Sequence, residues 1–156
     1  MRQALELAWE AAAAGEVPVG CVIVQKGRVV GRGRNRREEN QRTASHAEME
    51  AIAQANDALG TWRLDDCALY VTLEPCPMCA GAIINARIPR VVYGASDRKC
   101  GAVDSVCSLF SMEFNHHPQV ESGVREAECG ALLTEFFRNL RMELRSRPRW
   151  KPGNNQ

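Results

Sequence analysis

Two short clusters of residues in this chain have the types and the spacing of a metal-ligand set. The first is His46-Ala47-Glu48, and the second, further along the chain, is Pro75-Cys76-Pro77-Met78-Cys79. One imidazole and two thiolates can hold a zinc ion at three corners of a tetrahedron and leave the fourth corner for water. The two clusters therefore predict a zinc site with ligands His46, Cys76 and Cys79.

The carboxylate of Glu48 is the second element of this chemistry. A zinc ion with two thiolates and a neutral imidazole carries almost no net charge, so we expect it to acidify water less than a three-histidine zinc does. A general base beside the water is then needed, and Glu48 is placed to be that base. The spacing H-x-E followed by P-C-x-x-C is typical of zinc-dependent nucleobase deaminases, which replace an amino group on a base ring with oxygen.

Each part of the pattern also has a simpler interpretation. A C-x-x-C pair alone can be a redox pair, although Pro77 inside it and the distant His46 argue against that. Ser45-His46-Ala47-Glu48 also matches the capping box S-x-x-E, in which Ser45 would cap a helix. The combination of both clusters favours the deaminase site, and Ser45 could still cap the helix.

Both clusters are predicted to stand at helix N-termini. Pro75 disfavours helical geometry at the preceding residue, and Pro77 is tolerated in a first helical turn. Residues two apart on a helix point about 200° away from each other, so His46 and Glu48 can reach one ion only from the helix end. The partial positive charge of two helix N-termini would favour thiolates and developing negative charge there.

The remaining pattern indicates a single α/β domain over residues 1–147 and a polar tail over 148–156 that we expect to fray. The strand–helix–strand unit around the cysteine pair predicts a parallel pair of strands. Residues 35–44 are polar and without period, and 96–115 give no clear assignment. We predict helices over 3–14, 45–59, 76–86 and 129–144, and strands over 17–24, 28–32, 68–73, 90–94 and 119–122. Lys26-Gly27 is predicted to form a tight turn that joins the first two strands in a hairpin.

Composition places the chain among ordinary globular proteins. Its 156 residues are 45% hydrophobic and 25% charged, and no apolar run reaches the roughly 18 residues that a membrane helix needs. The first residues do not resemble a signal peptide, and seven cysteines do not suggest a disulfide framework, so we expect a reducing cytoplasm. Five cysteines lie outside the metal motif and are expected to pack as small buried groups: Cys21, Cys67, Cys100, Cys107 and Cys129.

Net charge is only +1, but cations gather in two stretches that could track phosphates. Nearby acids, Glu38, Glu39 and Glu143, leave open that these stretches are merely solvated faces. The first stretch contains Arg28, Arg32, Arg34, Arg36, Arg37 and Arg42, and the second contains Arg138, Arg141, Arg145, Arg147, Arg149 and Lys151.

Beyond the metal motif, the chain resembles the bacterial tRNA-specific adenosine deaminases over roughly residues 1–145. Besides the two clusters, the resemblance rests on segments such as Glu16-Val17-Pro18-Val19-Gly20, Leu69-Tyr70-Val71-Thr72-Leu73-Glu74, Arg90-Val91-Val92-Tyr93-Gly94-Ala95 and Cys129-Gly130-Ala131-Leu132-Leu133. It implies a three-layer α/β/α fold of the cytidine deaminase type with a mixed five-stranded sheet. It also implies a homodimer with one zinc ion per subunit, which converts the wobble adenosine of an arginine tRNA anticodon to inosine.

The same resemblance assigns substrate-binding residues. Asn35 would hydrogen-bond the flipped base, Val17 and Pro18 would wall the pocket, and anticodon contacts would fall near Asp97, Lys99, Asn115 and His116. Two segments depart from the family pattern: Arg42-Thr43-Ala44-Ser45, before the metal histidine, and His117-Pro118.

Two other functions stay open at this point. The zinc motif also suits a deaminase of free bases or nucleotides such as guanine, cytosine or deoxycytidylate. A non-catalytic, zinc-stabilised RNA-binding module is the third possibility, but a structural zinc has four protein ligands and no need of Glu48.

Overall fold

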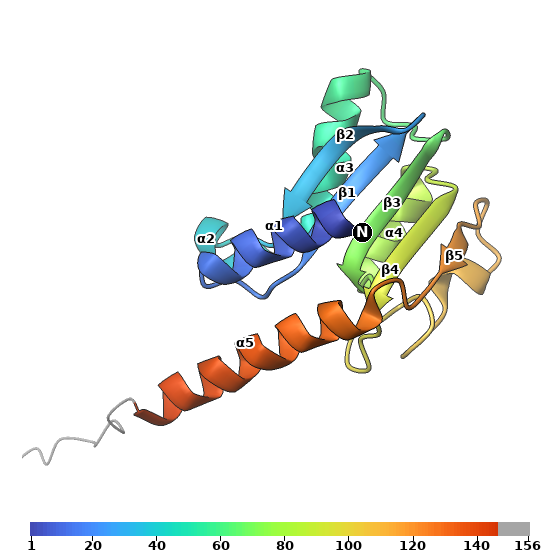
Figure 1. The fold of residues 1–156 in the computed structure, drawn as a ribbon. Coiled ribbons are helices and arrows are strands. Elements are labelled where there is room, and N and C mark those ends of the chain that lie inside the picture. The colour runs from blue at the N-terminus through green and yellow to red at the C-terminus, as the bar shows by residue number, and fades with distance from the viewer. Residues whose placement is uncertain (147–156) are drawn as a thin grey trace, which may run out of the picture.

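A computed structural model describes residues 1–146 of the chain. One five-stranded mixed sheet carries the fold, with strand order β2-β1-β3-β4-β5 (Figure 1). β1 pairs antiparallel with β2 and β3, whereas β3, β4 and β5 are parallel. The strands are β1 Gly20–Gln25, β2 Arg28–Arg34, β3 Cys67–Leu73, β4 Arg90–Ala95 and β5 Gln119–Glu121.

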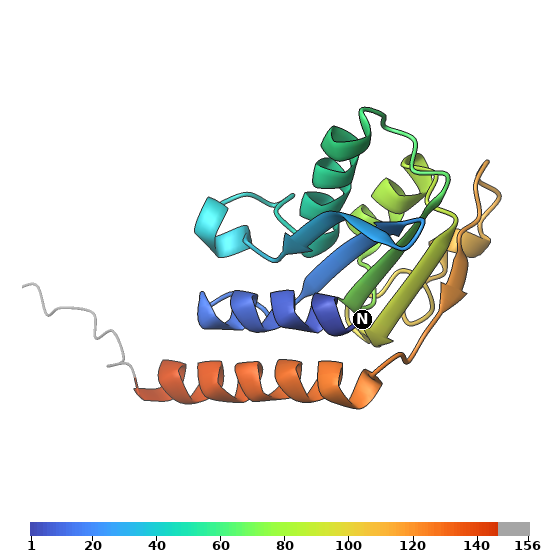
Figure 2. The same ribbon diagram turned by 45° about the horizontal axis from the view of Figure 1, so that its top comes forward.

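Helices cover both faces of this sheet, which confirms the three-layer expectation. α1 (Arg2–Ala13) and α5 (Glu126–Ser146) lie side by side on one face, and α3 (Ala47–Leu59) and α4 (Pro77–Asn85) cover the other (Figure 2). The main apolar core lies between the sheet and α3 and α4, and a smaller cluster under α1 and α5 contains Leu5, Ala95 and Cys129. Within residues 1–146, no helix is long and apolar enough to span a bilayer.

The β1–β2 hairpin forms as its turn residues predict. Lys26 and Gly27 both have positive φ, 47° and 78°, which is the backbone of a type I′ two-residue turn. β1 begins at Gly20 and not at Val17 as predicted, because Pro18 has no N–H to donate to a ladder and Val19 N–H bonds Val17 O at 2.8 Å instead.

Two further segments show features that their sequence patterns do not reveal. The polar segment 35–44 contains a one-turn helix, α2 (Arg37–Asn40), whose Glu39 N–H donates to the buried Glu16 Oε1 at 2.6 Å. Helical periodicity cannot be detected over four residues. The predicted last helix is present, but most of its apolar stripe is not buried in the single chain: Leu140 and Leu144 are 37% and 53% exposed. The predicted tail 148–156 lies outside the described residues.

Glycines in β2 let α3 approach the sheet closely. A Cβ atom on Gly33 would overlap the Ala47 carbonyl oxygen and the Ala51 amide nitrogen of α3. Gly33→Ala is therefore expected to lower the free energy of unfolding by about 1–3 kcal/mol, the usual cost of overpacking, in urea denaturation. Gly130→Ala in α5 is the control, because its Cβ meets nothing within 4 Å and alanine favours a helix. Equal stability of the two variants would refute this packing assignment.

Candidate metal and catalytic site

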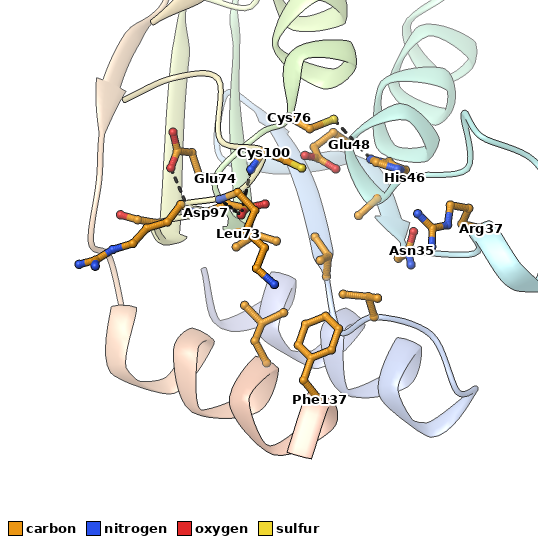
Figure 3. Close-up of a pocket in the computed structure, with 17 residues that line it drawn as sticks. Asn35, Arg37, His46, Glu48, Leu73, Glu74, Cys76, Asp97, Cys100 and Phe137 are labelled. Atoms are coloured by element: carbon orange, nitrogen blue, oxygen red, sulfur yellow. Dashed lines mark hydrogen bonds between the residues drawn. The ribbon is translucent and has the colours of Figure 1, made fainter. Parts of the chain in front are cut away.

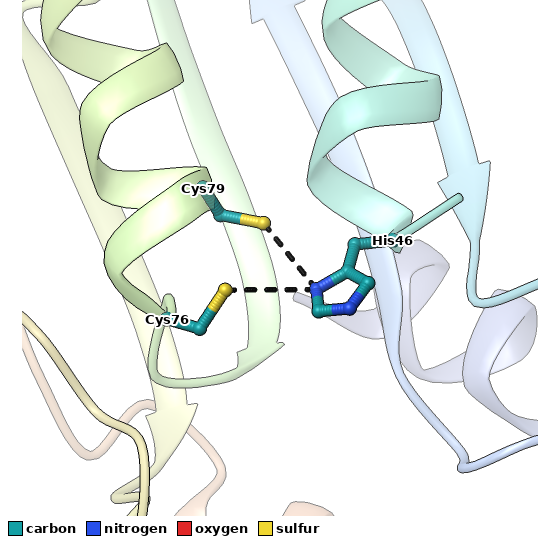
Figure 4. A group of neighbouring side chains, drawn as sticks. All are labelled: His46, Cys76 and Cys79. Atoms are coloured by element: carbon teal, nitrogen blue, oxygen red, sulfur yellow. Dashed lines mark hydrogen bonds between the residues drawn. The ribbon is translucent and has the colours of Figure 1, made fainter. Parts of the chain in front are cut away.

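The metal motif lies where two helices begin. α3 starts directly after His46, and α4 starts directly after Cys76, so both N-termini face the same point at the end of the sheet (Figure 4). Pro77 occupies the start of α4, where its missing N–H costs no helical hydrogen bond. The prediction that both clusters stand at helix N-termini is confirmed.

The three expected ligands converge on one point. His46 Nδ1 lies 3.6 Å from Cys76 Sγ and 3.6 Å from Cys79 Sγ, and all three ligand atoms lie within 4.8 Å of one another (Figure 4). Tetrahedral zinc with bonds of about 2.3 Å to sulfur and about 2.05 Å to nitrogen would set its nitrogen and sulfur ligands about 3.6 Å apart. The donor set and its spacing therefore fit zinc, and this is the one such cluster among the described residues.

The three side chains of the cluster shift one another's pKa values. The Cys79 thiol, which is fully buried, donates to Cys76, and this bond together with His46 lowers the pKa of Cys76 to about 4 despite its partial burial. The same bond and burial raise the pKa of Cys79. The Cys76 thiolate in turn raises the pKa of His46. A bound cation would favour the deprotonated form of both thiols.

Glu48 stands in the first turn of α3 beside the cluster and is only 4% exposed. Burial raises its pKa to about 7, because a buried carboxylate loses its hydration. A carboxyl group with a pKa near neutrality can both take and return a proton, which suits a general acid–base. The two halves of the sequence motif thus meet in one place.

Ser45 does not cap α3. The N-cap residue is His46, with extended backbone angles and no capping hydrogen bond from its side chain, and the Ser45 hydroxyl instead accepts a bond from Asn40 Nδ2 at 3.0 Å. The match to a capping box is therefore coincidental, and Glu48 has no such structural task.

A cavity of about 650 Å³ opens over the cluster and contains His46, Glu48 and Cys76 in its lining. Figure 3 shows Asn35 and Arg37 on one side of it, Glu74, Asp97 and Cys100 on the other, and Phe137 of α5 below. Arg37, the first residue of α2, and Arg98 and Lys99, which follow Asp97 in the chain, also belong to the lining, so cations come to the cavity from two separate segments. A flat apolar ring could enter this cavity while an attached anionic chain stays at its rim.

The predicted substrate residues divide into two groups. Val17, Asn35, Asp97 and Lys99 line the cavity with the metal cluster. Pro18 is buried next to Val17 but does not line the cavity.

The structure does not bring Asn115 and His116 to the cavity. His116 Nε2 bonds Ile88 O at 2.8 Å, at the opposite end of β4, and Asn115 is exposed. The RNA contacts assigned to these two residues stay a prediction.

The cysteine prediction was wrong for two of five residues. Cys21, Cys67 and Cys129 are buried as expected, whereas Cys100 and Cys107 are exposed, and Cys100 lines the cavity. All seven cysteines lie among the described residues, and none of them forms a disulfide.

Of the basic stretches, Arg34 and Arg36 pair with Glu39 and Arg37 pairs with Glu38, as a solvated face would. Arg37 nevertheless borders the cavity. Arg147, Arg149 and Lys151 lie outside the described residues.

Two buried carboxylates that sequence reasoning did not single out hold the cavity walls. Glu16, 1% exposed, accepts a bond from Asn35 Nδ2 at 3.1 Å. This bond fixes the orientation of the amide, so that Asn35 Oδ1 is the acceptor that remains for a ligand. Glu74, 2% exposed, accepts bonds from the opposite wall. Their only sequence signal was an acid beside an apolar strand segment, which indicates no partner.

Comparison with known proteins agrees with this geometry. A family model described as MafB19-like deaminase matches residues 1–141. The tRNA-specific adenosine deaminase of Bacillus subtilis is 51% identical over 142 residues, which cover 90% of this chain and 88% of that protein. The chain belongs to the tRNA-specific adenosine deaminase family. The resemblance inferred from the motifs is therefore confirmed, and the protein is an enzyme.

Solved structures related to this deaminase share its fold. One, from a study of A-to-I editing by tRNA:A34 deaminases at the wobble position, aligns with a TM-score of 0.82 at 48% identity and covers 85% of this chain and 97% of that one. The guanine deaminase of Bacillus subtilis aligns with a TM-score of 0.60 at 31% identity and covers 97% and 94%. The fold is thus shared with structures described as a tRNA:A34 deaminase and a guanine deaminase.

Proposed function

We propose that this deaminase is zinc-dependent and converts adenosine to inosine at the wobble position of a tRNA anticodon, with an arginine tRNA as the substrate. The observation that carries the proposal is the convergence of His46 Nδ1 with two cysteine sulfurs beside the buried Glu48. Adenosine and water give inosine and ammonia. When bound, zinc would polarise the attacking water.

The protein's own residues bind the base and transfer the protons. Asn35 Oδ1, oriented by Glu16, is available to a donor on the flipped base. Glu48 takes a proton from the water and delivers it to N1 of the ring as the new C6–O bond forms. It then takes the proton of the new C6 hydroxyl and passes it to the exocyclic nitrogen, so that the C6–N6 bond breaks, ammonia leaves and C6 becomes the carbonyl of inosine.

RNA is the proposed substrate because cations come to the cavity from two separate segments. Arg37 in one and Arg98 and Lys99 in the other are placed to meet phosphates on either side of an extruded base. An unpaired anticodon base is also cheap to extrude.

The test is incubation with an anticodon stem–loop that carries adenine at the wobble position. Inosine is expected in this substrate but not in the same stem–loop with guanine there. For about three phosphate contacts, kcat/KM is expected to fall by about tenfold or more between 50 and 200 mM salt. Activity that does not change with salt would count against an RNA substrate.

A deaminase of free nucleobases is the second candidate, favoured by the likeness to a guanine deaminase along almost the whole chain. Ammonia release from free guanine, cytosine and adenosine, measured beside the stem–loop, separates the two. Turnover of a free base with no inosine in RNA would favour this candidate.

A homodimer in the cytoplasm completes the proposal. Val106, Met112 and Phe114, all from one segment, are 44–59% exposed, and exposed apolar side chains support an interface. Light scattering coupled to gel filtration is expected to give twice the chain mass.

A further inference from the structure

The loop over residues 96–105 forms one wall of the cavity and has no regular secondary structure. Ser96, Asp97, Arg98, Lys99 and Cys100 all line the cavity. Because a loop without a backbone ladder needs other bonds to hold it, the partners of its N–H groups decide where this wall stands.

One buried side chain, Glu74, accepts four of the eight hydrogen bonds that the N–H groups of this loop donate, whereas three go to Asp97 and one to Pro75 O. Glu74 Oε1 accepts from the N–H groups of Val103, Asp104 and Ser105 at 3.2, 2.8 and 2.9 Å. Its other oxygen, Oε2, accepts from Asp97 N–H at 2.9 Å and from the Ser105 hydroxyl. The carboxylate therefore holds both ends of the loop (Figure 3 shows its bond to Asp97).

The fit around this carboxylate is tight. Glu74 is 2% exposed and forms no ion pair within the described part of the chain, so N–H and O–H donors alone satisfy its charge. A Cβ atom on Gly101 would overlap the Glu74 carboxyl group, so glycine lets the loop close over this group without displacing it. Ala102 N–H also donates to Pro75 O at 2.9 Å, beside the metal motif.

We propose that Glu74 is a positioning residue that fixes the substrate-binding loop 96–105 relative to the metal ligands. Only Pro75 separates Glu74 from Cys76. The metal ligand and the residue that holds the loop are therefore close neighbours in the chain. Glu74 acts through the loop and does not touch the reacting base. The expected effect of Glu74 on substrate binding rests on the proposed function. Its hydrogen bonds to the loop do not depend on that function.

The test is Glu74→Gln, which keeps the shape but gives one acceptor oxygen in place of two. The loss of about one hydrogen bond to a charged group is expected to raise KM for the stem–loop about tenfold and to change kcat less than about threefold. Zinc content is expected to stay at the wild-type level. Gly101→Ala, which displaces the carboxylate from the other side, is expected to give the same KM effect. Glu121→Gln is the matched control, because this exposed carboxylate lies on β5, away from the cavity, and pairs with Arg90 of β4.

A second measurement does not depend on substrate. Hydrogen exchange at the amides of Asp104 and Ser105 is expected to accelerate about tenfold or more in Glu74→Gln, whereas the amides of β3 exchange at the wild-type rate. Unchanged loop exchange and unchanged KM would overturn the proposal, as would a fall in zinc content and kcat at unchanged KM. If the wild-type protein does not edit the stem–loop, the proposed function is wrong but the role of Glu74 is not affected. The hydrogen-exchange rates of the loop amides then test that role by themselves.

Discussion

Glu48→Ala is expected to keep its zinc and to lose about 10²–10⁴ in the rate of deamination, the usual cost of removing a general acid–base. Glu48 is not among the three converging ligand atoms, so metal content should not depend on it. The measurements are zinc per chain by elemental analysis and the single-turnover rate of inosine formation on the stem–loop.

Two comparisons separate the proton-transfer role of Glu48 from a structural one. Glu48→Gln keeps the size of the side chain but cannot take a proton, so it is expected to be impaired to a similar degree. Glu50→Ala is the matched control, since Glu50 lies in the first turn of the same helix but does not line the cavity. Small carboxylates such as formate are expected to restore part of the rate in Glu48→Ala. A Glu48→Ala enzyme that turns over at the wild-type rate would refute the assignment.

The metal centre could be predicted from sequence because its determinants are local. Each half of the ligand set lies within a few residues, and prolines beside the cysteines define where their helix begins. The same local signals predicted the β1–β2 turn at Lys26-Gly27. The local pattern was misleading for the start of α3. Ser45 matches a capping motif, but the N-cap residue is His46, one residue later, and His46 is also part of the metal cluster.

The walls of the cavity could not be predicted because they depend on contacts between distant segments. Loop 96–105 has no periodicity, since buried Glu74 holds it through side-chain bonds. Glu16 in the same way joins Asn35 to α2, and neither acid stands in a pattern that identifies its partner. The exposure of Cys100 likewise follows from the path of this loop and not from composition.

Cys76→Ser and Cys79→Ser are expected to lose most of their zinc and, with it, nearly all deaminase activity. Loss of a group that only hydrogen-bonds a metal ligand costs about 10–100-fold in metal affinity, so loss of a ligand is expected to cost more. A serine hydroxyl does not replace a thiolate, because it is not ionised at neutral pH and is a harder donor.

Cys76→Ser is the more informative of the two variants, because its effect on metal binding is easier to separate from an effect on stability. Cys76 is the N-cap residue of α4, and serine is a favoured N-cap, so the helix is expected to persist while the metal is lost. Cys79 is fully buried, and a hydroxyl there would also lower stability. Cys107→Ser is the control, since this exposed thiol lies outside both the cavity and the ligand cluster, and it is expected to keep both zinc and activity. A Cys76→Ser protein with one zinc per chain and wild-type turnover would exclude Cys76 as a ligand. The three-ligand centre on which the mechanism depends would then be wrong.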